Sequence, residues 1–193
     1  MHTWDELNNF ILHCRGCGLA RTRRLPVVGQ GNRRTDLMMI AEAPGAREDE
    51  EGVPFVGPAG KMLDQLLAGA GLSRGEIYLT NIVKCHPPGN RDPREEEKDL
   101  CMPYLRYETH LLRPKIIVCL GRVAAQRIIS LDYRITRQHG QWFHRAGVAM
   151  TAIYHPSAVL RDPLKGPDTF VDLKSIQAKV KELCPDSLTP LVR

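Results

Sequence analysis

The sequence lacks the features of a membrane-bound or exported protein. Its 193 residues contain no run of eighteen apolar residues, a length close to the minimum for a membrane-spanning helix. The first residues, MHTWDELNNF, have neither the basic region nor the apolar region of a signal peptide. We therefore expect a cytoplasmic protein without a membrane partner. Thiols are normally reduced in the cytoplasm, so the six cysteines would be available as ligands.

Acidic residues are absent between Arg15 and Arg34. The same segment contains six arginines, namely Arg15, Arg21, Arg23, Arg24, Arg33 and Arg34. A basic segment of this kind suits a polyanion, and nucleic acid is the commonest one. A solvated basic face explains the pattern equally well. The net charge of +5 does not decide between them.

Internal repeats and low-complexity segments are also missing, so we predict a single domain over residues 1–193. Four short apolar runs are typical of buried strands: 37–40, 77–82, 115–120 and 148–154. Helical patterns lie before, between and after these runs, including one that begins at Pro93 and reaches about Leu112. This alternation predicts a three-layer α/β/α fold with a four-stranded, mostly parallel central sheet.

Polar residues stand where three of these runs end: Glu42, Asn81 and His155. Because ligands of open α/β sheets bind at the carboxyl ends of strands, these three side chains could line one crevice. Taken singly, each is more often a surface residue or a satisfied core residue. Phe55, in the turn GVPFVG, either packs into the core or offers its ring to a flipped base. We expect the acidic stretch before Gly60 to be a loop.

Cysteines are spaced as metal ligands often are. Cys14 and Cys17 form a C-x2-C pair, and Cys85 and Cys101 are separated by fifteen residues. Four thiolates suit zinc or an iron–sulfur cluster, and spacing alone does not choose between them. Ordinary packed cysteines are the alternative. Cys119 lies within an apolar run, which predicts a core thiol.

Three stretches together resemble the motifs of family 4 uracil-DNA glycosylases, the iron–sulfur members of their superfamily. They are AEAPGAREDEEGVPFVGPAG, YLTNIVKCHPPGNRDP and YHPSAVLR, and the resemblance extends from Cys14 to about Arg161. It implies a parallel sheet between helices. It also implies hydrolysis of the N-glycosidic bond of uracil in single- or double-stranded DNA, which leaves an abasic site in base excision repair. We expect a monomer.

The resemblance implies that four residues bind the base: Asn81, Phe55, Ala43 and Gly45. Asn81 would read the Watson–Crick edge of the extruded uracil, and Phe55 would stack on it. Residues 159–161 match the loop that enters the minor groove. The DNA-binding residues would be Arg91, Ser157, Leu160 and Arg161.

Three residues would be catalytic by the same resemblance: His155, Glu42 and Glu48. His155 would face uracil O2, and Glu42 would help to hold uracil or water. Family 1 enzymes carry an Asp that acts on water where this chain has Ala43, so Glu48 is the candidate for that role. A solvated carboxylate in a mobile acidic loop is the alternative for Glu48.

A 4Fe–4S cluster is the cofactor that the resemblance implies. Its ligands would be Cys14, Cys17, Cys85 and Cys101, and its role would be structural rather than catalytic.

Two other functions compete with glycosylase activity. One is the relative that traps DNA covalently through a histidine-bearing basic insert, but CHPPGNRDPREEE contains no such Arg/Lys-rich insert. The other is a non-catalytic nucleic-acid-binding or redox protein that uses the cluster as an electron relay. Release of free uracil from DNA would separate an enzyme from both.

Overall fold

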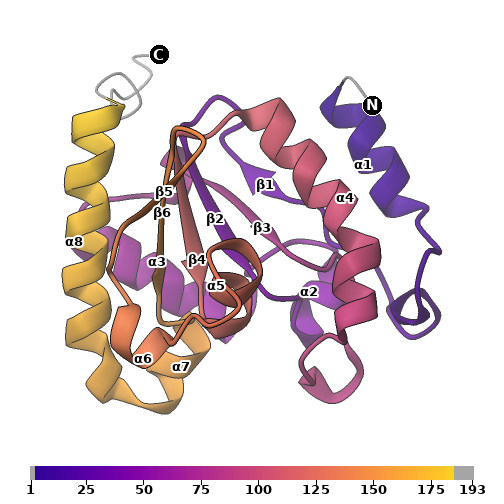
Figure 1. The fold of residues 1–193 in the computed structure, drawn as a ribbon. Helices are drawn as coiled ribbons and strands as arrows, with labels where there is room; N and C mark the ends of the chain where they lie inside the picture. Colours follow the sequence, from indigo (N-terminus) through magenta and orange to yellow (C-terminus); the bar gives the residue numbers. More distant parts are fainter. Residues whose placement is uncertain (1–2, 185–193) are drawn as a thin grey trace.

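A six-stranded β-sheet runs through the computed structural model, which describes residues 3–184 (Figure 1). The strands in spatial order are β1 (Gln30–Gly31), β3 (Tyr78–Asn81), β2 (Leu37–Ala41), β4 (Ile116–Leu120), β6 (Val148–Ile153) and β5 (Phe143–Arg145). The central strands β3, β2, β4 and β6 are parallel, whereas β1 and β5 pair antiparallel at the two edges. The predicted α/β class is confirmed, and all four predicted strands are present. The predicted total of four strands is wrong.

The two edge strands have no apolar run that would reveal them in the sequence. β1 is only two residues long and both are exposed. In β5, His144 and Arg145 are exposed and Phe143 is only partly buried. Short, polar edge strands are common because they discourage pairing with other chains.

Helices cover both faces of the sheet. They are α1 (Trp4–Leu12), α2 (Ala46–Glu51), α3 (Pro58–Ala70), α4 (Glu95–Leu112), α5 (Arg122–Ile128), α6 (Ile135–Gln138), α7 (Pro156–Arg161) and α8 (Gly166–Leu183). Short 3₁₀ turns are η1 (Gly18–Arg21), η2 (Arg74–Glu76), η3 (Pro88–Asn90) and η4 (Pro163–Lys165). None of the helices within residues 3–184 is long and apolar enough to cross a membrane.

Alternate side chains of the central strands build two separate cores. Met38 and Ile40 of β2 point to the face covered by α4 and α5. Leu37 and Met39 point to the opposite face, where they pack with α3 and α8. Figure 1 shows the same division, with α8 and α3 on one side of the sheet and α4 and α1 on the other. The predicted three-layer arrangement is therefore confirmed.

The helix predicted from Pro93 begins two residues later, at Glu95. Its start is fixed by Glu97, whose side chain accepts the backbone N–H of Arg94 at 2.8 Å. The end at Leu112 agrees with the prediction.

The acidic stretch after β2 is partly helical, so the loop predicted there is wrong. Gly45 precedes α2 in an extended conformation, and Gly52 ends it at a left-handed φ of 70°. A helix of six residues is too short to leave a clear periodic pattern in the sequence. Its Glu48 is buried, with 8% of its surface exposed, so the solvated carboxylate considered for this position is also wrong.

Candidate active site

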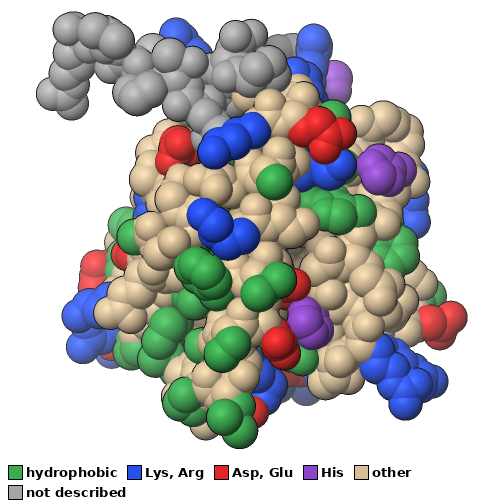
Figure 2. Space-filling view, turned by 90° about the vertical axis from the view of Figure 1, so that its left-hand side faces the viewer, with side chains coloured by type: hydrophobic (Ala, Val, Ile, Leu, Met, Phe, Trp, Pro, Cys, Tyr) green, Lys and Arg blue, Asp and Glu red, His purple; other side chains and the backbone are tan. Residues whose placement is uncertain are grey.

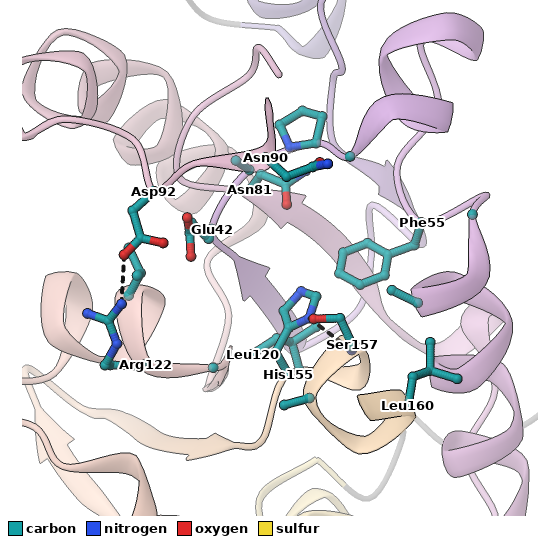
Figure 3. A pocket seen from close by; sticks show the side chains of 18 of the residues that line it. Glu42, Phe55, Asn81, Asn90, Asp92, Leu120, Arg122, His155, Ser157 and Leu160 are labelled. Atoms are coloured by element: carbon teal, nitrogen blue, oxygen red, sulfur yellow. Dashed lines mark hydrogen bonds and ion pairs between the residues drawn. The ribbon is translucent and has the colours of Figure 1, made fainter. Parts of the chain in front are cut away.

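A pocket of about 710 Å³ opens at the carboxyl ends of the parallel strands. Glu42 follows β2, Asn81 ends β3, Leu120 ends β4, and His155 follows β6. Figure 3 shows these residues around one space, with the Phe55 ring on the opposite wall from Glu42. The structure thus brings together the three polar residues that the sequence placed at strand ends.

Asn81 lies on the floor of this pocket with an unpaired acceptor. The residue is buried, and its Oδ1 has no hydrogen-bond partner among the described residues. Its backbone oxygen, in contrast, accepts a hydrogen bond from Lys84 Nζ at 2.8 Å. Buried polar atoms are normally paired, so an unpaired oxygen that faces a cavity marks a place for a ligand donor.

A buried ion pair lies behind Asn81. Lys84 Nζ is 2.7 Å from Glu108 Oε2, and both side chains are almost completely inaccessible. The hydroxyl of Thr80 lies 2.6 Å from Lys84 Nζ and 3.0 Å from both Glu108 oxygens, and the hydroxyl of Tyr78 donates to Glu108 Oε1. Each charge therefore has several partners, as a buried charge requires.

The contacts of His155 fix its tautomer. Its Nδ1 accepts the backbone N–H of Ser157 at 3.1 Å and lies 2.7 Å from the Ser157 hydroxyl. A backbone N–H can only donate, so Nδ1 carries the lone pair and the proton of the neutral ring is on Nε2. Burial, assisted by the positive charge of Arg161, lowers the pKa of His155 to about 4. At neutral pH His155 is therefore an uncharged N–H donor.

Glu42 is a carboxyl group with a shifted pKa. Burial and the negative charge of Asp92 raise its pKa to about 7, against the opposing effect of Arg122 and Lys98. Asp92 and Arg122 form an ion pair at 2.6 Å beside the pocket (Figure 3). A carboxyl with a pKa near 7 can exchange a proton at physiological pH.

Glu48 enters the same pocket from α2. Its Oε1 accepts the backbone N–H of Gly57 at 2.8 Å, which joins α2 to the start of α3. A Cβ at Gly45 would lie 2.6 Å from Glu48 Oε2, so the side chain packs closely against the glycine backbone. Gly45 and Ala43, predicted to bind the base, both line the pocket.

Basic and apolar side chains surround the mouth of the pocket. Lining residues with a positive charge are Arg47, Arg91, Arg122, Arg161 and Lys165. Arg91 is held by Glu97 through two hydrogen bonds of 2.8 and 2.7 Å. Leu160 is 42% exposed beside Arg161, and further exposed apolar residues follow on η4 and α8, namely Leu164, Phe170 and Val171. Figure 2 shows apolar side chains gathered on the lower part of this side of the molecule.

All four residues predicted to bind DNA line the pocket. Arg91, Leu160 and Arg161 line the mouth. Ser157 also lines the pocket, where its hydroxyl and backbone N–H both meet His155.

The four predicted ligand cysteines lie near one another on the α4 side of the molecule. Cys85 and Cys101 are buried, Cys14 and Cys17 are partly buried, and all four are free thiols. Burial raises the pKa of Cys101 to about 12, and Cys85 and Cys14 add to the rise, while Lys84 opposes it. Burial also raises the pKa of Cys85. The nearby Arg23 opposes this rise, whereas Cys17 and Cys14 add to it. Arg23 links the two segments, because its guanidinium donates both to the sulfur of Cys85 and to the carbonyl oxygen of Cys14.

Several N–H groups point at these sulfurs. Arg23 Nη1 donates to Cys85 Sγ at 2.8 Å, and the backbone N–H of Lys84 donates to Cys101 Sγ at 3.3 Å. Such donors stabilise thiolates. Within residues 3–184 no three His, Cys, Asp or Glu side chains meet closely enough to hold a single metal ion. Four sulfurs from two segments are a donor set that either an iron–sulfur cluster or zinc accepts.

Arginines of the basic segment, residues 15–34, contact other parts of the chain at several positions. Arg23 bonds the carbonyl oxygen of Cys14 as well as the sulfur of Cys85. The backbone N–H of Arg24 donates to both carboxylate oxygens of Asp49. The guanidinium of Arg33 stands 5.3 Å from the ring centre of Trp4. Arg23 and Arg33 thus have side-chain partners within the chain, which accounts for part of the basic segment without a polyanion.

Sequence reasoning missed the buried charges of Lys84 and Glu108. A signal for Glu108 was present, because it falls on the buried stripe of α4 between Leu105 and Leu112. A charged residue on such a stripe predicts a buried partner. No comparable signal identified Lys84. The thiol of Cys119 was correctly predicted to lie in the core.

Comparisons with known proteins agree with this geometry. The family model described as the uracil DNA glycosylase superfamily matches residues 28–177. The chain is 43% identical over 192 residues to a type-4 uracil-DNA glycosylase of Archaeoglobus fulgidus, a match that covers 95% of this chain and 94% of that protein. It is 40% identical over 167 residues to a type-4 uracil-DNA glycosylase of Pyrobaculum aerophilum, with 82% and 85% covered. A third, from Sulfurisphaera tokodaii, is 38% identical over 172 residues, with 84% and 78% covered.

Proposed function

The chain belongs to the uracil-DNA glycosylase superfamily, in its type-4 group, and on this basis we propose that its pocket receives a uracil flipped out of DNA. The protein is a uracil-specific DNA glycosylase, which hydrolyses the N-glycosidic bond and leaves an abasic site for base excision repair. One observation carries the assignment of the pocket. The unpaired Oδ1 of Asn81, the neutral ring of His155 and the ring of Phe55 share one cavity at the carboxyl edge of the sheet.

Asn81 supplies recognition of the base. Its Oδ1 accepts the N3–H of uracil, and the amide NH₂ donates to a uracil oxygen on the same edge. Cytosine carries a lone pair at N3, which would face Oδ1 and repel it. The same amide orientation thus favours uracil over the normal base from which it arises.

His155 supplies stabilisation of the leaving group. Uracil departs as an anion, and an N–H donor at O2 gains most when that charge has developed. Nδ1 is occupied by Ser157, so the proton on Nε2 is the one directed to the base. The pKa near 4 keeps the ring neutral, so the donor needs no titration in the physiological range.

The two carboxyl groups serve the sugar and the water. The sugar develops positive charge as the bond breaks, and a nearby carboxylate stabilises it or orients the attacking water. Glu42 and Glu48 both line the pocket, and Glu48 Oε1 is occupied by the N–H of Gly57. We assign the water to Glu42, whose carboxylate oxygens have no such backbone partner within residues 3–184. We assign to Glu48 the role of shaping the loop.

DNA meets the basic rim of the pocket. Phosphates bind Arg47, Arg91, Arg122, Arg161 and Lys165, and this part of the affinity falls with salt. Leu160, exposed beside Arg161, fills the gap that the flipped nucleotide leaves in the base stack. We expect the protein to act as a monomer, which light scattering on the protein with and without DNA would test.

Cys14, Cys17, Cys85 and Cys101 would hold a 4Fe–4S cluster. When bound, the cluster supplies a cross-link between the turn after α1 and the segment that leads from Asn81 to α4. Hydrolysis changes no oxidation state, so the cysteines serve the structure. Arg23 and the backbone of Lys84 stabilise the negative charge of the sulfurs.

Incubation with an oligonucleotide that contains one uracil tests the proposal. Anaerobically prepared protein should release free uracil and leave an alkali-labile site, whereas a matched thymine oligonucleotide should stay intact. Binding of DNA without uracil release would indicate the non-catalytic protein. A stable protein–DNA adduct would indicate the covalent trapping protein.

A further inference from the structure

We propose that Arg74, which lies outside the pocket, is a positioning residue for uracil excision: it holds Phe55 in the backbone conformation that turns its ring toward the base. The inference rests on the proposed function of the pocket. No motif in the sequence points to Arg74, which follows α3 at the start of the short turn η2.

Phe55 has a backbone conformation that a bulky residue rarely adopts. Its φ is 56°, in the left-handed region that favours glycine. Glycines stand nearby at 52 and 57, but the left-handed position itself carries the aromatic residue. Such a conformation persists only where the surroundings impose it, and it is most common at functional sites. The ring that results is buried and stands 5.8 Å from the ring of His155, centre to centre.

The guanidinium of Arg74 makes the contacts that hold Phe55 in this conformation. Its Nη2 donates to the carbonyl oxygens of Phe55 at 2.7 Å and of Gly60 at 3.2 Å. Its Nη1 lies 3.4 Å from the carbonyl oxygen of Pro54, and its Nε pairs with the carboxylate of Asp64. Arginine offers several donors in one rigid plane, which a lysine cannot reproduce. One side chain therefore fixes two consecutive carbonyls of the loop against α3.

Gly60 of α3 packs against the same Phe55 peptide from the other side. A Cβ at this position would lie 1.8 Å from the carbonyl oxygen of Phe55 and 3.0 Å from its Cα. The first turn of α3 therefore packs directly on the peptide that Arg74 holds. Arg74 is itself anchored, because Ser73 and Glu76 form a capping box around η2, with the Ser73 N–H donating to Glu76 Oε2 at 2.7 Å.

When uracil binds, no conformational entropy is lost in ordering the base-stacking ring if that ring is already in place. Without the contacts of Arg74, the backbone of Phe55 can relax to a negative φ, which redirects the side chain. A ring that is misplaced by about 1 Å can reduce the rate by about 10²-fold. Arg74 thus acts on the reaction only through Phe55, and this dependence separates positioning from general support of the fold.

A double-mutant cycle measures that dependence. Arg74→Met, Phe55→Ala and the double variant are compared by single-turnover uracil release at a temperature where all remain folded. Phe55→Ala should lower the rate by about 10- to 100-fold through lost stacking. Arg74→Met should lower it by about 10-fold or more in the native background, and by less than about twofold in the Phe55→Ala background. Equal effects of Arg74→Met in both backgrounds would overturn the proposal.

Two controls accompany the cycle. Gly60→Ala should reproduce the defect by pushing the Phe55 peptide from the other side, and its effect should also vanish in the Phe55→Ala background. Arg106→Met, which removes an exposed arginine from α4, should leave uracil release unchanged.

A spectroscopic measurement tests the positioning without the reaction. The chain has four phenylalanines, so fluorophenylalanine labelling gives four ¹⁹F resonances, of which Phe55→Ala identifies one. Arg74→Met should shift or broaden that resonance and leave the other three in place. An unchanged Phe55 resonance would overturn the proposal. If the native protein released no uracil, the proposed function would fail, while this measurement would still decide on the role of Arg74.

Discussion

The pH dependence of uracil release tests the role of Glu42. Burial and Asp92 raise the pKa of this carboxyl to about 7. A carboxylate that orients water or stabilises a sugar cation acts only when it is ionised. With a pKa of about 7, the single-turnover rate should therefore rise about tenfold between about pH 6 and about pH 8, then level off. His155 adds no step in this range because its pKa is about 4.

Three variants test whether the ionisation of Glu42 causes this rise in rate. Glu42→Gln keeps the shape of the side chain, should abolish the rise, and should lower the plateau by about 10²-fold or more. Asp92→Asn removes a negative charge, so the ionised Glu42 becomes more stable and the midpoint should move to lower pH. Arg122→Gln removes a positive charge and should move the midpoint to higher pH.

The assay requires saturating enzyme and constant ionic strength, because DNA binding varies with salt. A rate that does not change across this pH range would refute the reasoning. So would a rise that persists with the same midpoint in Glu42→Gln, since another group would then titrate.

Three further predictions concern the groups around the base and the cysteines. His155→Ala should lower single-turnover release by about 10²–10³-fold, and by more than Glu48→Gln, which keeps an acceptor for its backbone donor; the reverse order would show that Glu48, rather than Glu42, acts on the water. Asn81→Asp should alter the choice of base more than the affinity for uracil-free duplex, because a carboxylate cannot donate to the uracil edge; unchanged release with weaker duplex binding would refute this. Replacement of Cys85 or Cys101 by Ser should abolish the brown colour of the purified protein and its iron content, and stoichiometric zinc without iron in the native protein would contradict the cluster.

The sequence was sufficient for the four central strands and for the edge of the sheet where the pocket opens. Buried parallel strands are continuous apolar runs, so their ends could be located, and the polar residues at those ends had to meet at one edge. Asn81 and His155 were found in this way. The same signal does not exist for β1 and β5, whose exposed residues carry no apolar run.

Contacts between distant segments could not be predicted. The Arg74 guanidinium reaches back nineteen residues to Phe55, and the Lys84 ammonium reaches forward twenty-four residues to Glu108. The buried stripe of α4 indicates Glu108, but nothing in the local pattern of residues identifies Lys84 as its partner or the carbonyl that Arg74 will meet. The burial of Glu48 has the same origin, since it depends on the N–H of Gly57 and on the approach of α3.

Asn81, His155 and Phe55, which we propose to face the base, are each held by a partner within the chain. Lys84 bonds the backbone of Asn81, Ser157 occupies Nδ1 of His155, and Arg74 holds the carbonyl of Phe55. Each partner fixes a position, while Asn81 Oδ1 stays unpaired among the described residues, so we expect the site to be ordered before a base arrives.

This arrangement also explains a buried ion pair behind the pocket. A charge removed from such a pair leaves its partner buried and unpaired, at a cost of about 3–5 kcal/mol, which is a large part of the roughly 5–15 kcal/mol that stabilises a typical domain. An apolar pair of similar volume could fill the same space, but it could not donate to the backbone of Asn81. Lys84 does so while its own N–H bonds the sulfur of Cys101. One residue thus joins the segment that we propose to read uracil to the segment of Cys101, and a cluster held by the four cysteines would thereby support recognition of the base without taking part in the reaction.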